Sequence, residues 1–531
     1  MRRHVFRTTV CVALLLGPAL AVHAGDDPTS SDLANALPTP TLHGTLELSL
    51  ADAIAMGLEN NLNVEIVRHD PLIAYEDSRL AWAPYDPAWT TDFGYSDDRT
   101  PNANFLFMTD ELSREILGGS GGITALVPWL NTVVTTEINT AETRTNAAIN
   151  TLSPEFATGL KVVARQPLLR GLIWNETWTQ LKISGVIYQG SLDEFRRNLM
   201  DTVQAIENAY WTLIANEERV RVAQQSVELA TALLGQVTTQ YEVGVVSKVE
   251  IAEAEAGLAS NEFDLITAQN RYQNTMDEAI DLILGPHLTA DSRIQIEPTD
   301  RPDEFVSYDV DVRQAAAIAM LHRPELALAQ REIERLEINL KFAKNRRLPQ
   351  LDIEGRYGHA GLAGNQNPVG GVADPQFFGD WQNSFEPFSN SFGVRGILTV
   401  PLGNVEGRHS VSMAQLELRK AHVRRRRVEQ DVLLEVRRAA RDLASSQEGI
   451  EAAERRQAAA AEQLRAEQIR LEYGESTPFD VLLRQTDLIS AQQEYIGAFQ
   501  VYRISVTGLD RSQGTILRNR NVDIEDVARL R

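Results

Sequence analysis

One short segment of the sequence has the spacing of a catalytic motif. Gly118-Gly119-Ser120-Gly121-Gly122 matches the Gly-x-Ser-x-Gly pattern of a serine nucleophile. That pattern requires an apolar strand before the serine and a helix after it. Here the polar stretch Leu112–Glu115 precedes the glycines, and a strand-like run follows them. We therefore predict a flexible turn at this place and no catalytic serine.

Metal and thiol chemistry are also unsupported. Seven of the nine histidines lie beyond residue 24, and none forms an HxxxH pair or a cluster with carboxylates, as a metal site would require. The single cysteine, Cys11, lies in a segment that we interpret as a cleaved leader. The mature chain is therefore predicted to be no enzyme and to carry no metal, cofactor or disulfide.

Two short segments have the residues of a helix-capping box. In Ser247–Glu250 and in Thr477–Asp480, a hydroxyl residue is followed by an acid three positions later. Each segment comes shortly after a glycine, Gly244 or Gly474, which can adopt the left-handed backbone that ends a helix. The pattern predicts two tight turns between helices, with the acids as caps.

The charge of the chain argues against nucleic acid as a partner. The 531 residues carry a net charge of -22, with 73 acidic against 51 basic side chains. A phosphate-binding surface needs clustered Lys and Arg. The one basic run, Arg424–Arg427, lies among helix-forming residues, and we interpret it as a solvated helix face.

The first 24 residues have the features of a secretory signal peptide. A basic start with Arg2, Arg3 and Arg7 precedes an apolar stretch, and Val22-His23-Ala24 offers a cleavage site before Gly25. Beyond residue 24, no run approaches the 18 apolar residues of a membrane helix. We therefore predict an exported protein.

The sequence contains an internal duplication. Tyr241–Gly244 corresponds to Leu471–Gly474 at an offset of 230 residues, and apolar residues recur every seven positions on both sides of each glycine. Near the start of each half, Asp52–Asn61 parallels Gln314–Arg323 at an offset of 262. The change of offset places roughly 30 additional residues in the first half, inside a segment with β character.

Each half is predicted to contain short helices, a β segment and a pair of long helices. A long helix over about 172–243, and its counterpart over about 407–473, would each span on the order of 100 Å. Their heptad spacing requires a partner helix, as in a coiled coil. The predicted organisation is a signal peptide 1–24, a flexible segment 25–45, a first repeat 46–284 with a β-hairpin at about 86–168, a linker 285–308, a second repeat 309–515 with a β-hairpin at about 349–402, and a tail 516–531.

The predicted strands alternate between apolar and polar residues. Trp89, Phe93 and Tyr95 share one parity, opposite to Asp92, and the segments 160–165, 351–357 and 392–400 alternate in the same way. This pattern suits a barrel with a wet lumen, although a soluble sandwich would show the same alternation. The segment 361–390 between two strands reads as an exposed loop, and the strand-like run Thr132–Thr140 has no place that the sequence determines.

In the order and spacing of its motifs, the chain resembles the TolC-like outer membrane efflux proteins. The motifs are Gln166–Gly171 before the first long helix, Pro401-Leu402 before the second, His322–Leu326, and the turn Tyr473–Leu482. The resemblance covers roughly residues 46–515. It implies a mainly α fold with a β-barrel part: a homotrimer in which each chain gives four strands to a twelve-stranded transmembrane barrel, above a hollow cylinder of long helices.

The same resemblance implies a location and partners. The protein would lie in the outer membrane of a Gram-negative bacterium, in contact with its lipid, and reach far into the periplasm. There it would dock with a periplasmic adaptor protein and an inner-membrane pump of the RND or ABC type. It would be a passive duct for export. The sequence does not identify the exported cargo.

Family members also suggest roles for the two tips. The residues that would contact the adaptor are Gly244, Ser247, Gly474 and Thr477. The residues that would narrow the periplasmic entrance are Glu250, Glu253 and Asp480. In this chain Leu483 stands where a second acid is often found, and Ser476 and Leu471 replace the Arg and Tyr that latch the closed state. Capping alone and a cation-preferring gate both stay open for the acids.

Two other classes of function were weighed. A non-channel coiled-coil scaffold would share the heptads, but it has no need of aromatic-faced β-hairpins between the helices. A secreted hydrolase would need a catalytic constellation that the sequence does not contain.

Overall fold

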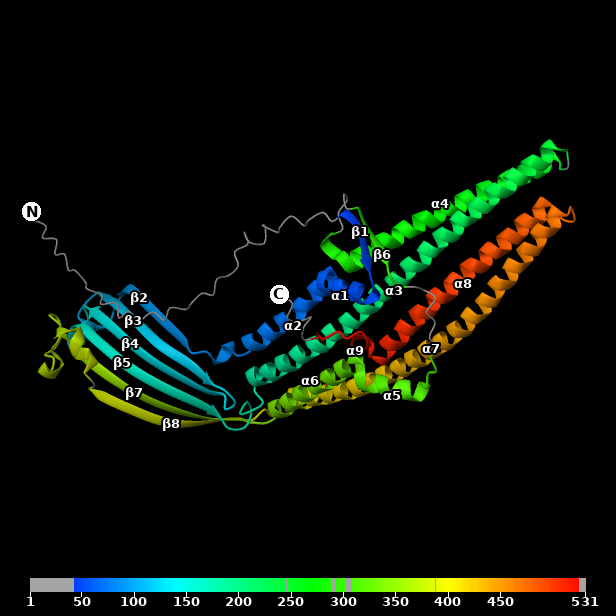
Figure 1. Ribbon diagram of the computed structural model, residues 1–531. Coiled ribbons are helices and arrows are strands. Elements are labelled where there is room, and N and C mark those ends of the chain that lie inside the picture. The colour runs from blue at the N-terminus through cyan, green and yellow to red at the C-terminus, as the bar shows by residue number, and fades with distance from the viewer. Residues whose placement is uncertain (1–42, 245, 288–292, 301–307, 387, 525–531) are drawn as a thin grey trace, which may run out of the picture.

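The structure is a computed structural model that describes residues 43–244, 246–287, 293–300, 308–386 and 388–524. The predicted signal peptide and most of the predicted flexible segment 25–45 lie outside these ranges. The molecule is elongated, with a β-sheet at one end and two helical hairpins that reach the other end (Figure 1). Among the described residues, no helix is both long enough and apolar enough to cross a membrane.

The elements alternate between helical and strand segments along the chain. Helices are α1 (Leu50–Asn60), α2 (Leu62–Leu80), α3 (Glu176–Glu242), α4 (Lys248–Leu284), α5 (Val312–His322), α6 (Pro324–Arg346), α7 (Val405–Glu472), α8 (Pro478–Gln513) and α9 (Ile516–Asn519). Strands are β1 (His43–Leu48), β2 (Ala88–Pro101), β3 (Glu111–Val127), β4 (Thr132–Thr145), β5 (Leu152–Pro167), β6 (Arg293–Pro298), β7 (Gln350–Gln366) and β8 (Ser389–Thr399).

The duplication is confirmed by the helix bounds. Helices α1 and α2 begin 262 residues before α5 and α6, whereas α4 begins 230 residues before α8. Helices α4 and α8 both lead into a glycine, Gly285 or Gly514, with positive φ. A Cβ on Gly285 would lie 2.2 Å from the Asn60 carbonyl oxygen, and one on Gly514 would lie 2.8 Å from that of His322. Both halves therefore close the same joint, where a long helix pair meets two short helices.

The helices form one curved layer. In the part nearest the sheet, α2 packs on α3, α3 on α6, and α6 on α7, so that α2 and α7 are the edges of the layer. Further from the sheet, α3 pairs with α4 and α7 with α8, and α3 also contacts α8. The two predicted long helices, about 172–243 and 407–473, are confirmed as α3 and α7. Their heptads are buried in these pairings, as a coiled coil requires.

The largest hydrophobic core lies at the middle of the molecule. Residues of α1, α3, α4 and α9 surround the small parallel sheet formed by β1 and β6. Val203, Ile206 and Leu213 of α3 are fully buried there, and Ile516 of α9 packs into the same cluster. The sequence did not predict β1, β6 or the docking of the C-terminal segment, because each is too short to show a period.

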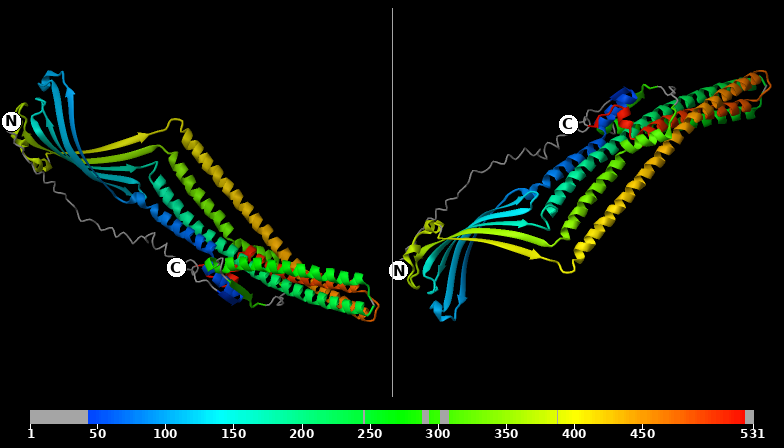
Figure 2. Two further views of the ribbon diagram at one scale, coloured as in Figure 1. Left: turned by 90° about the horizontal axis from the view of Figure 1, so that it is seen from above. Right: turned by 90° about the horizontal axis from the view of Figure 1, so that it is seen from below.

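The main sheet has six antiparallel strands in the order β2-β3-β4-β5-β7-β8. The expectation of four strands per chain is therefore corrected. The roughly 30 additional residues of the first half make two further strands, and the unplaced run Thr132–Thr140 belongs to β4. Figure 2 shows that the sheet is strongly twisted, with β2 and β8 at its two edges.

Two predictions about loops near this sheet are wrong. The glycine-rich segment Gly118–Gly122 lies inside β3 rather than in a flexible turn. Its glycines fit close neighbours, since a Cβ on Gly118 would lie 2.9 Å from the Thr140 carbonyl oxygen. The segment 361–390 is not simply an exposed loop, because β7 continues to Gln366. A short turn at Trp381–Phe385 also packs back on the strands, where the Trp381 indole donates to Thr140 at 2.8 Å.

The register confirms that the sheet has two unlike faces. Val162 of β5 lies opposite Tyr357 of β7, which lies opposite Phe392 of β8, so aromatic and aliphatic residues share one face. Arg165, Glu354 and Arg395 share the other face in the same way. On this polar face Arg165 pairs with Asp352 at 2.5 Å, and Arg395 pairs with Glu354 at 2.9 Å.

Candidate functional site

The two helical tips lie side by side at the end of the molecule opposite the sheet (Figures 1 and 2). Gly244 follows α3 with φ of 79°, and Gly474 follows α7 with φ of 75°. This left-handed backbone is the structural reason for glycine at both turns. A Cβ on either glycine would meet nothing within 4 Å. The tips are therefore free of covering side chains from their own chain.

The second tip carries a complete capping box. The Asp480 backbone N–H donates to Thr477 Oγ1 at 3.2 Å, and the Thr477 N–H donates to Asp480 Oδ2 at 3.4 Å. The Thr477 hydroxyl also donates to the same carboxylate at 2.7 Å. This hydroxyl lowers the pKa of Asp480, with smaller contributions from Arg470 and Arg484. Capping by Asp480, expected from the sequence, is confirmed.

The first tip repeats this arrangement more loosely. The Ser247 N–H and hydroxyl donate to Glu250 Oε1 at 3.5 and 3.4 Å. Glu253 lies one turn further along α4, where its side chain is exposed. Glu253 is therefore the one of the three acids for which the structure gives no capping role.

An apolar cluster holds the two tips together. Val237 of the first hairpin and Val481 of the second are almost completely buried in it, together with Leu464 and Leu471. A Cβ on Gly257 would lie only 2.8 Å from the Leu482 side chain, which shows how closely α4 and α8 approach. Within the described chain, no printed hydrogen bond or ion pair joins Glu250 or Glu253 to Asp480. The tips are thus brought together, but the acids are not in mutual contact.

A buried polar network at the middle of the molecule was missed by sequence reasoning. Arg323 donates to Glu435 and to Glu325, in each case at 2.8 Å. Arg511 joins Glu325 at 3.0 Å and Asp201 at 2.7 Å. Burial raises the pKa of Glu325, but Arg323 and Arg511 outweigh it, and the pKa is lowered overall. The His322–Leu326 motif marks this network, which ties α3, α6, α7 and α8 together.

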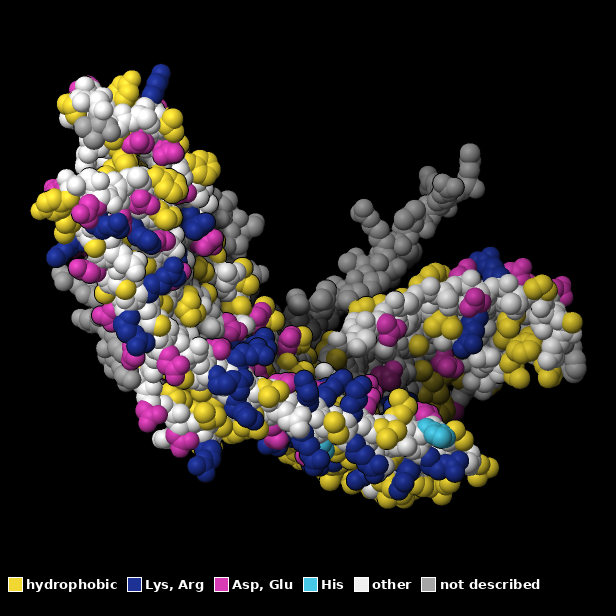
Figure 3. All heavy atoms as spheres, turned by 90° about the vertical axis from the view of Figure 1, so that its right-hand side faces the viewer, with side chains coloured by type: hydrophobic (Ala, Val, Ile, Leu, Met, Phe, Trp, Pro, Cys, Tyr) yellow, Lys and Arg dark blue, Asp and Glu magenta, His cyan; other side chains and the backbone are white. Residues whose placement is uncertain are grey.

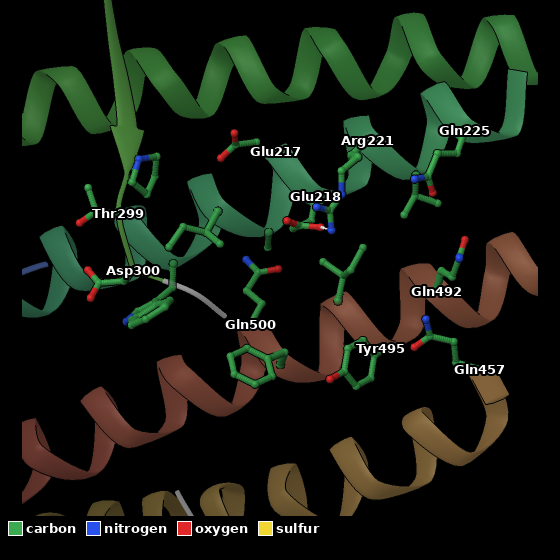
Figure 4. Close-up of a pocket in the computed structure, with 17 residues that line it drawn as sticks. Glu217, Glu218, Arg221, Gln225, Thr299, Asp300, Gln457, Gln492, Tyr495 and Gln500 are labelled. Carbon is green, nitrogen blue, oxygen red and sulfur yellow. Dashed lines mark hydrogen bonds and ion pairs between the residues drawn. The ribbon is translucent and has the colours of Figure 1, made fainter. Parts of the chain in front are cut away.

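A cleft of about 660 Å³ opens beside this network, between α3, α8 and the end of β6 (Figure 4). Glu217, Glu218 and Arg221 line one side, and Tyr495 and Gln500 of α8 line the other. Arg221 pairs with Glu218, and burial raises the pKa of Glu217. No lining residue forms a nucleophile–base pair, and the described residues include no group of His, Cys, Asp and Glu that could hold a metal ion.

The two edges of the helical layer expose apolar stripes at helical spacing. On α2, Ile66, Ile73 and Leu80 are 63, 59 and 67 % exposed. On α7, Leu416 and Val423 are 59 and 64 % exposed. Large apolar residues so exposed along a helix are typical of an interaction surface.

Charged residues interrupt both stripes with opposite sign. Asp70 and Asp77 alternate with the apolar residues of α2, whereas Lys420 and Arg427 alternate with those of α7. Figure 3 shows Lys and Arg side chains gathered along α7, which includes the predicted solvated run Arg424–Arg427. That run is exposed, and Arg427 pairs with Asp431 on the same helix at 3.0 Å.

The sheet has matching open edges. Every residue of β2 is exposed, and Phe93 and Tyr95 are 84 and 65 % exposed. At the other edge, Phe392 of β8 is 87 % exposed. Long apolar edge strands of this kind are pairing surfaces.

Comparison with known proteins identifies one matching family model. Residues 124–285 and 316–515 each match the model described as outer membrane efflux protein. The two matched ranges correspond to the two halves of the duplication. No curated protein matches the sequence.

Several solved structures share the fold at low sequence identity. The Campylobacter jejuni CmeC outer membrane channel has a TM-score of 0.65 and 15 % identity, over 91 % of this chain and 89 % of that one. The outer membrane protein VceC of Vibrio cholerae has a TM-score of 0.61 and 13 % identity, over 88 and 96 %. The open state of the Neisseria gonorrhoeae MtrE outer membrane channel has a TM-score of 0.62 and 15 % identity, over 88 and 89 %.

Proposed function

Because this chain belongs to the outer membrane efflux protein family, we propose that it is the outer-membrane channel subunit of a tripartite export system. It lies in the outer membrane, with its helices in the periplasm and its tips furthest from the membrane. Three copies enclose a passive duct, and no catalytic step is involved. The observation that carries this proposal is that one chain is an unclosed segment of a cylinder, with open edges on both its helical layer and its sheet.

The two edges of one chain are suited to each other. Helix α2 runs towards the sheet and α7 runs away from it, so the α7 of one copy would meet the α2 of the next in an antiparallel pair. Ile66, Ile73 and Leu80 would pack on Leu416 and Val423. A contact between two different surfaces closes into a ring when its rotation divides the circle, and the family resemblance favours three copies.

Charges on the edges favour the same pairing. Asp70 and Asp77 interrupt the apolar stripe of α2, and Lys420 and Arg427 interrupt that of α7 at the same four-residue and three-residue spacings. Opposite charges at the flanks of a helix pair select the partner and its orientation. Two α2 edges, both acidic, would repel each other, as would two basic α7 edges.

The tips are the proposed docking site for a periplasmic adaptor. Gly244 and Gly474 leave open surface at both turns, and Ser247 and Thr477 begin the helices that follow. An adaptor of complementary helical surface would seat on these tips and connect the duct to an inner-membrane pump. Glu250, Glu253 and Asp480 would then lie at the entrance. Three copies of each acid would attract cations and repel anions there.

The test of the channel is the state of the protein in the outer membrane. We expect a trimer that is extracted from outer membranes by detergent and that changes its migration on heating. Planar-bilayer recordings of this trimer should show discrete conductance steps. A scaffold protein without a channel would give no steps, and a protein recovered wholly from the soluble periplasmic fraction would contradict the proposal.

A further inference from the structure

We propose that β2 of each copy pairs with β8 of its neighbour, so that the closed trimer has a wall of eighteen strands rather than twelve. The inference rests on the proposed function, since it concerns how three copies close. It is carried by the continuity of the six-stranded sheet and by the helices on which its edge strands stand. The consequence is a wider outer opening for the exported cargo.

The sheet is equally well paired throughout. Fourteen residue pairs join β2 to β3 and fourteen join β3 to β4, against eleven between β7 and β8. Hydroxyl contacts support the junction of the additional strands, since the Oγ1 atoms of Thr124 on β3 and Thr135 on β4 lie 3.4 Å apart. A twelve-stranded wall would have β4 at its edge and would require β3 to leave this ladder. The added strands are therefore an integral part of the sheet.

The edge strands stand directly on the edge helices. Helix α2 ends at Leu80 and β2 begins at Ala88, while β8 ends at Thr399 and α7 begins at Val405. If α7 of one copy packs on α2 of the next, β8 and β2 of the same two copies meet above them. They also run in opposite directions, as an antiparallel ladder requires. Closure at β2 thus needs no rearrangement of either layer.

The apolar face of the sheet extends across the additional strands. Trp89 of β2 lies opposite Ile123 of β3, and Tyr95 lies opposite Leu117. Ile138 of β4 continues this face towards Leu160 of β5. A hairpin that stood outside the wall in water would have no reason to keep one aromatic and aliphatic face in register with the other strands. The parity indicates contact with lipid on this face of all six strands.

The widths of the two layers also agree. Six strands about 4.8 Å apart and tilted by about 40° cover an arc of about 37 Å, whereas four strands cover about 25 Å. Helices α2, α3, α6 and α7, at about 8–10 Å from axis to axis, cover about 32–40 Å. Six strands therefore match the four helices below them without a constriction.

A wall of eighteen strands has a different capacity for cargo. The diameter of a barrel grows roughly in proportion to its strand number, so the outer opening would be about 1.5 times as wide as with twelve strands. The polar face that lines it carries charges of both signs, among them Asp92 on β2 and Arg114 on β3. This geometry favours bulky, hydrated cargo over small apolar solutes.

Disulfide cross-linking tests the pairing, because the mature chain contains no native cysteine. Thr91→Cys on β2 is combined in turn with a cysteine at Phe392, Val394 or Leu398 of β8. A second set combines Ile138→Cys on β4 with the same β8 positions. A disulfide needs Cβ atoms about 3.5–4.5 Å apart, so only strands that are neighbours can react. The control pair, Thr124→Cys with Thr135→Cys, reports whether β3 stays on β4 within one chain.

We expect at least one β2–β8 pair to link purified trimers into a covalent ladder on non-reducing gels, and the β4–β8 set to give none. Cross-linking from β4 instead would overturn the eighteen-stranded wall and leave the trimeric channel intact. A trimer whose control pair links while neither set reacts would overturn it too. A protein that is monomeric in all variants would contradict the proposed function itself.

Discussion

The Glu207 carboxylate, which is fully buried in α3, accepts two hydrogen bonds from the guanidinium group of Arg520, at 2.6 and 2.9 Å. The two residues are 313 positions apart. Thr507 of α8 donates a third bond to the same carboxylate at 2.7 Å. This contact ties the C-terminal segment of the second half to the long helix of the first, at the centre of the molecule.

Removing one partner of this pair should destabilise the protein strongly. Glu207→Ala or Arg520→Ala leaves the other charge without its buried partner, and we expect a loss of about 3–5 kcal/mol. The double variant should lose less than the sum of the two. The exposed pair Glu218–Arg221 is the control, for which Arg221→Ala should change stability by about 0–1 kcal/mol. Denaturant midpoints measure both, and equal losses at the two pairs would contradict the prediction.

The two kinds of glycine turn should respond differently to one added methyl group. Gly244 and Gly514 both have positive φ, at 79° and 74°, so alanine is strained at either place by about 1–2 kcal/mol. Only at Gly514 does the new Cβ also meet backbone, 2.8 Å from the His322 carbonyl. Gly514→Ala should therefore lower the thermal midpoint clearly more than Gly244→Ala. Equal shifts would show that the joint at Gly514 yields easily.

Much of the fold was predictable from the sequence because its long-range pattern is periodic. The seven-residue spacing gave the ends of α3 and α7 to within a few residues, and the change of offset placed the additional residues in the β segment. The alternation around Phe93, Tyr357 and Phe392 assigned the correct faces. Periodicity of this kind depends only on which side of an element is buried.

The errors arose where a neighbour across space decides the local structure. Gly118–Gly122 has the composition of a turn, but β2 and β4 on either side hold it in a strand. Strand β4 could not be placed, because its partners are known only once β3 is known. Buried ion pairs such as Arg323–Glu435 and Glu207–Arg520 join residues more than a hundred positions apart. No local spacing signals such a contact.

Charge reversal on the edge helices tests the assembly of the trimer. Lys420→Glu with Arg427→Glu places acids on α7 opposite Asp70 and Asp77 of the neighbouring α2, so we expect the trimer to dissociate at lower detergent or salt stress. Reversing α2 as well, with Asp70→Lys and Asp77→Lys, should restore it. Native gels and light scattering measure the assembly. If the fourfold variant is no better than the double one, these edges do not meet.

Substitution of the tip glycines tests the adaptor site. Gly244→Glu and Gly474→Glu together place bulky charge on open surface, so export should be lost while the trimer yield is unchanged. The control is Gly244→Asn with Gly474→Asn, since asparagine tolerates the left-handed backbone and adds no charge. Export of a reporter cargo and cross-linking to a co-expressed adaptor are measured. Normal export by the glutamate variant would remove the docking role from these tips.

Ion selectivity separates the two roles proposed for the entrance acids. If Glu250, Glu253 and Asp480 line the entrance, Glu250→Gln, Glu253→Gln and Asp480→Asn should each weaken the cation preference in single-channel recordings. Block by multivalent cations should weaken as well. Capping alone predicts a small loss of stability at Glu250 and Asp480, no effect at Glu253, and unaltered selectivity in all three. The triple variant makes the comparison decisive.

The pH dependence of Asp480 provides a further measurement. Because the Thr477 hydroxyl lowers the pKa of Asp480 below its ordinary value of 3.8, the charge and its stabilising cap are present above that value. They persist somewhat below it and are lost only as the pH falls through the lowered pKa. Thr477→Val removes this hydroxyl and should move the loss to higher pH. If Asp480 faces the entrance, the cation preference shifts with it, whereas an acid that only caps α8 shifts the stability profile and leaves the selectivity profile of the wild type.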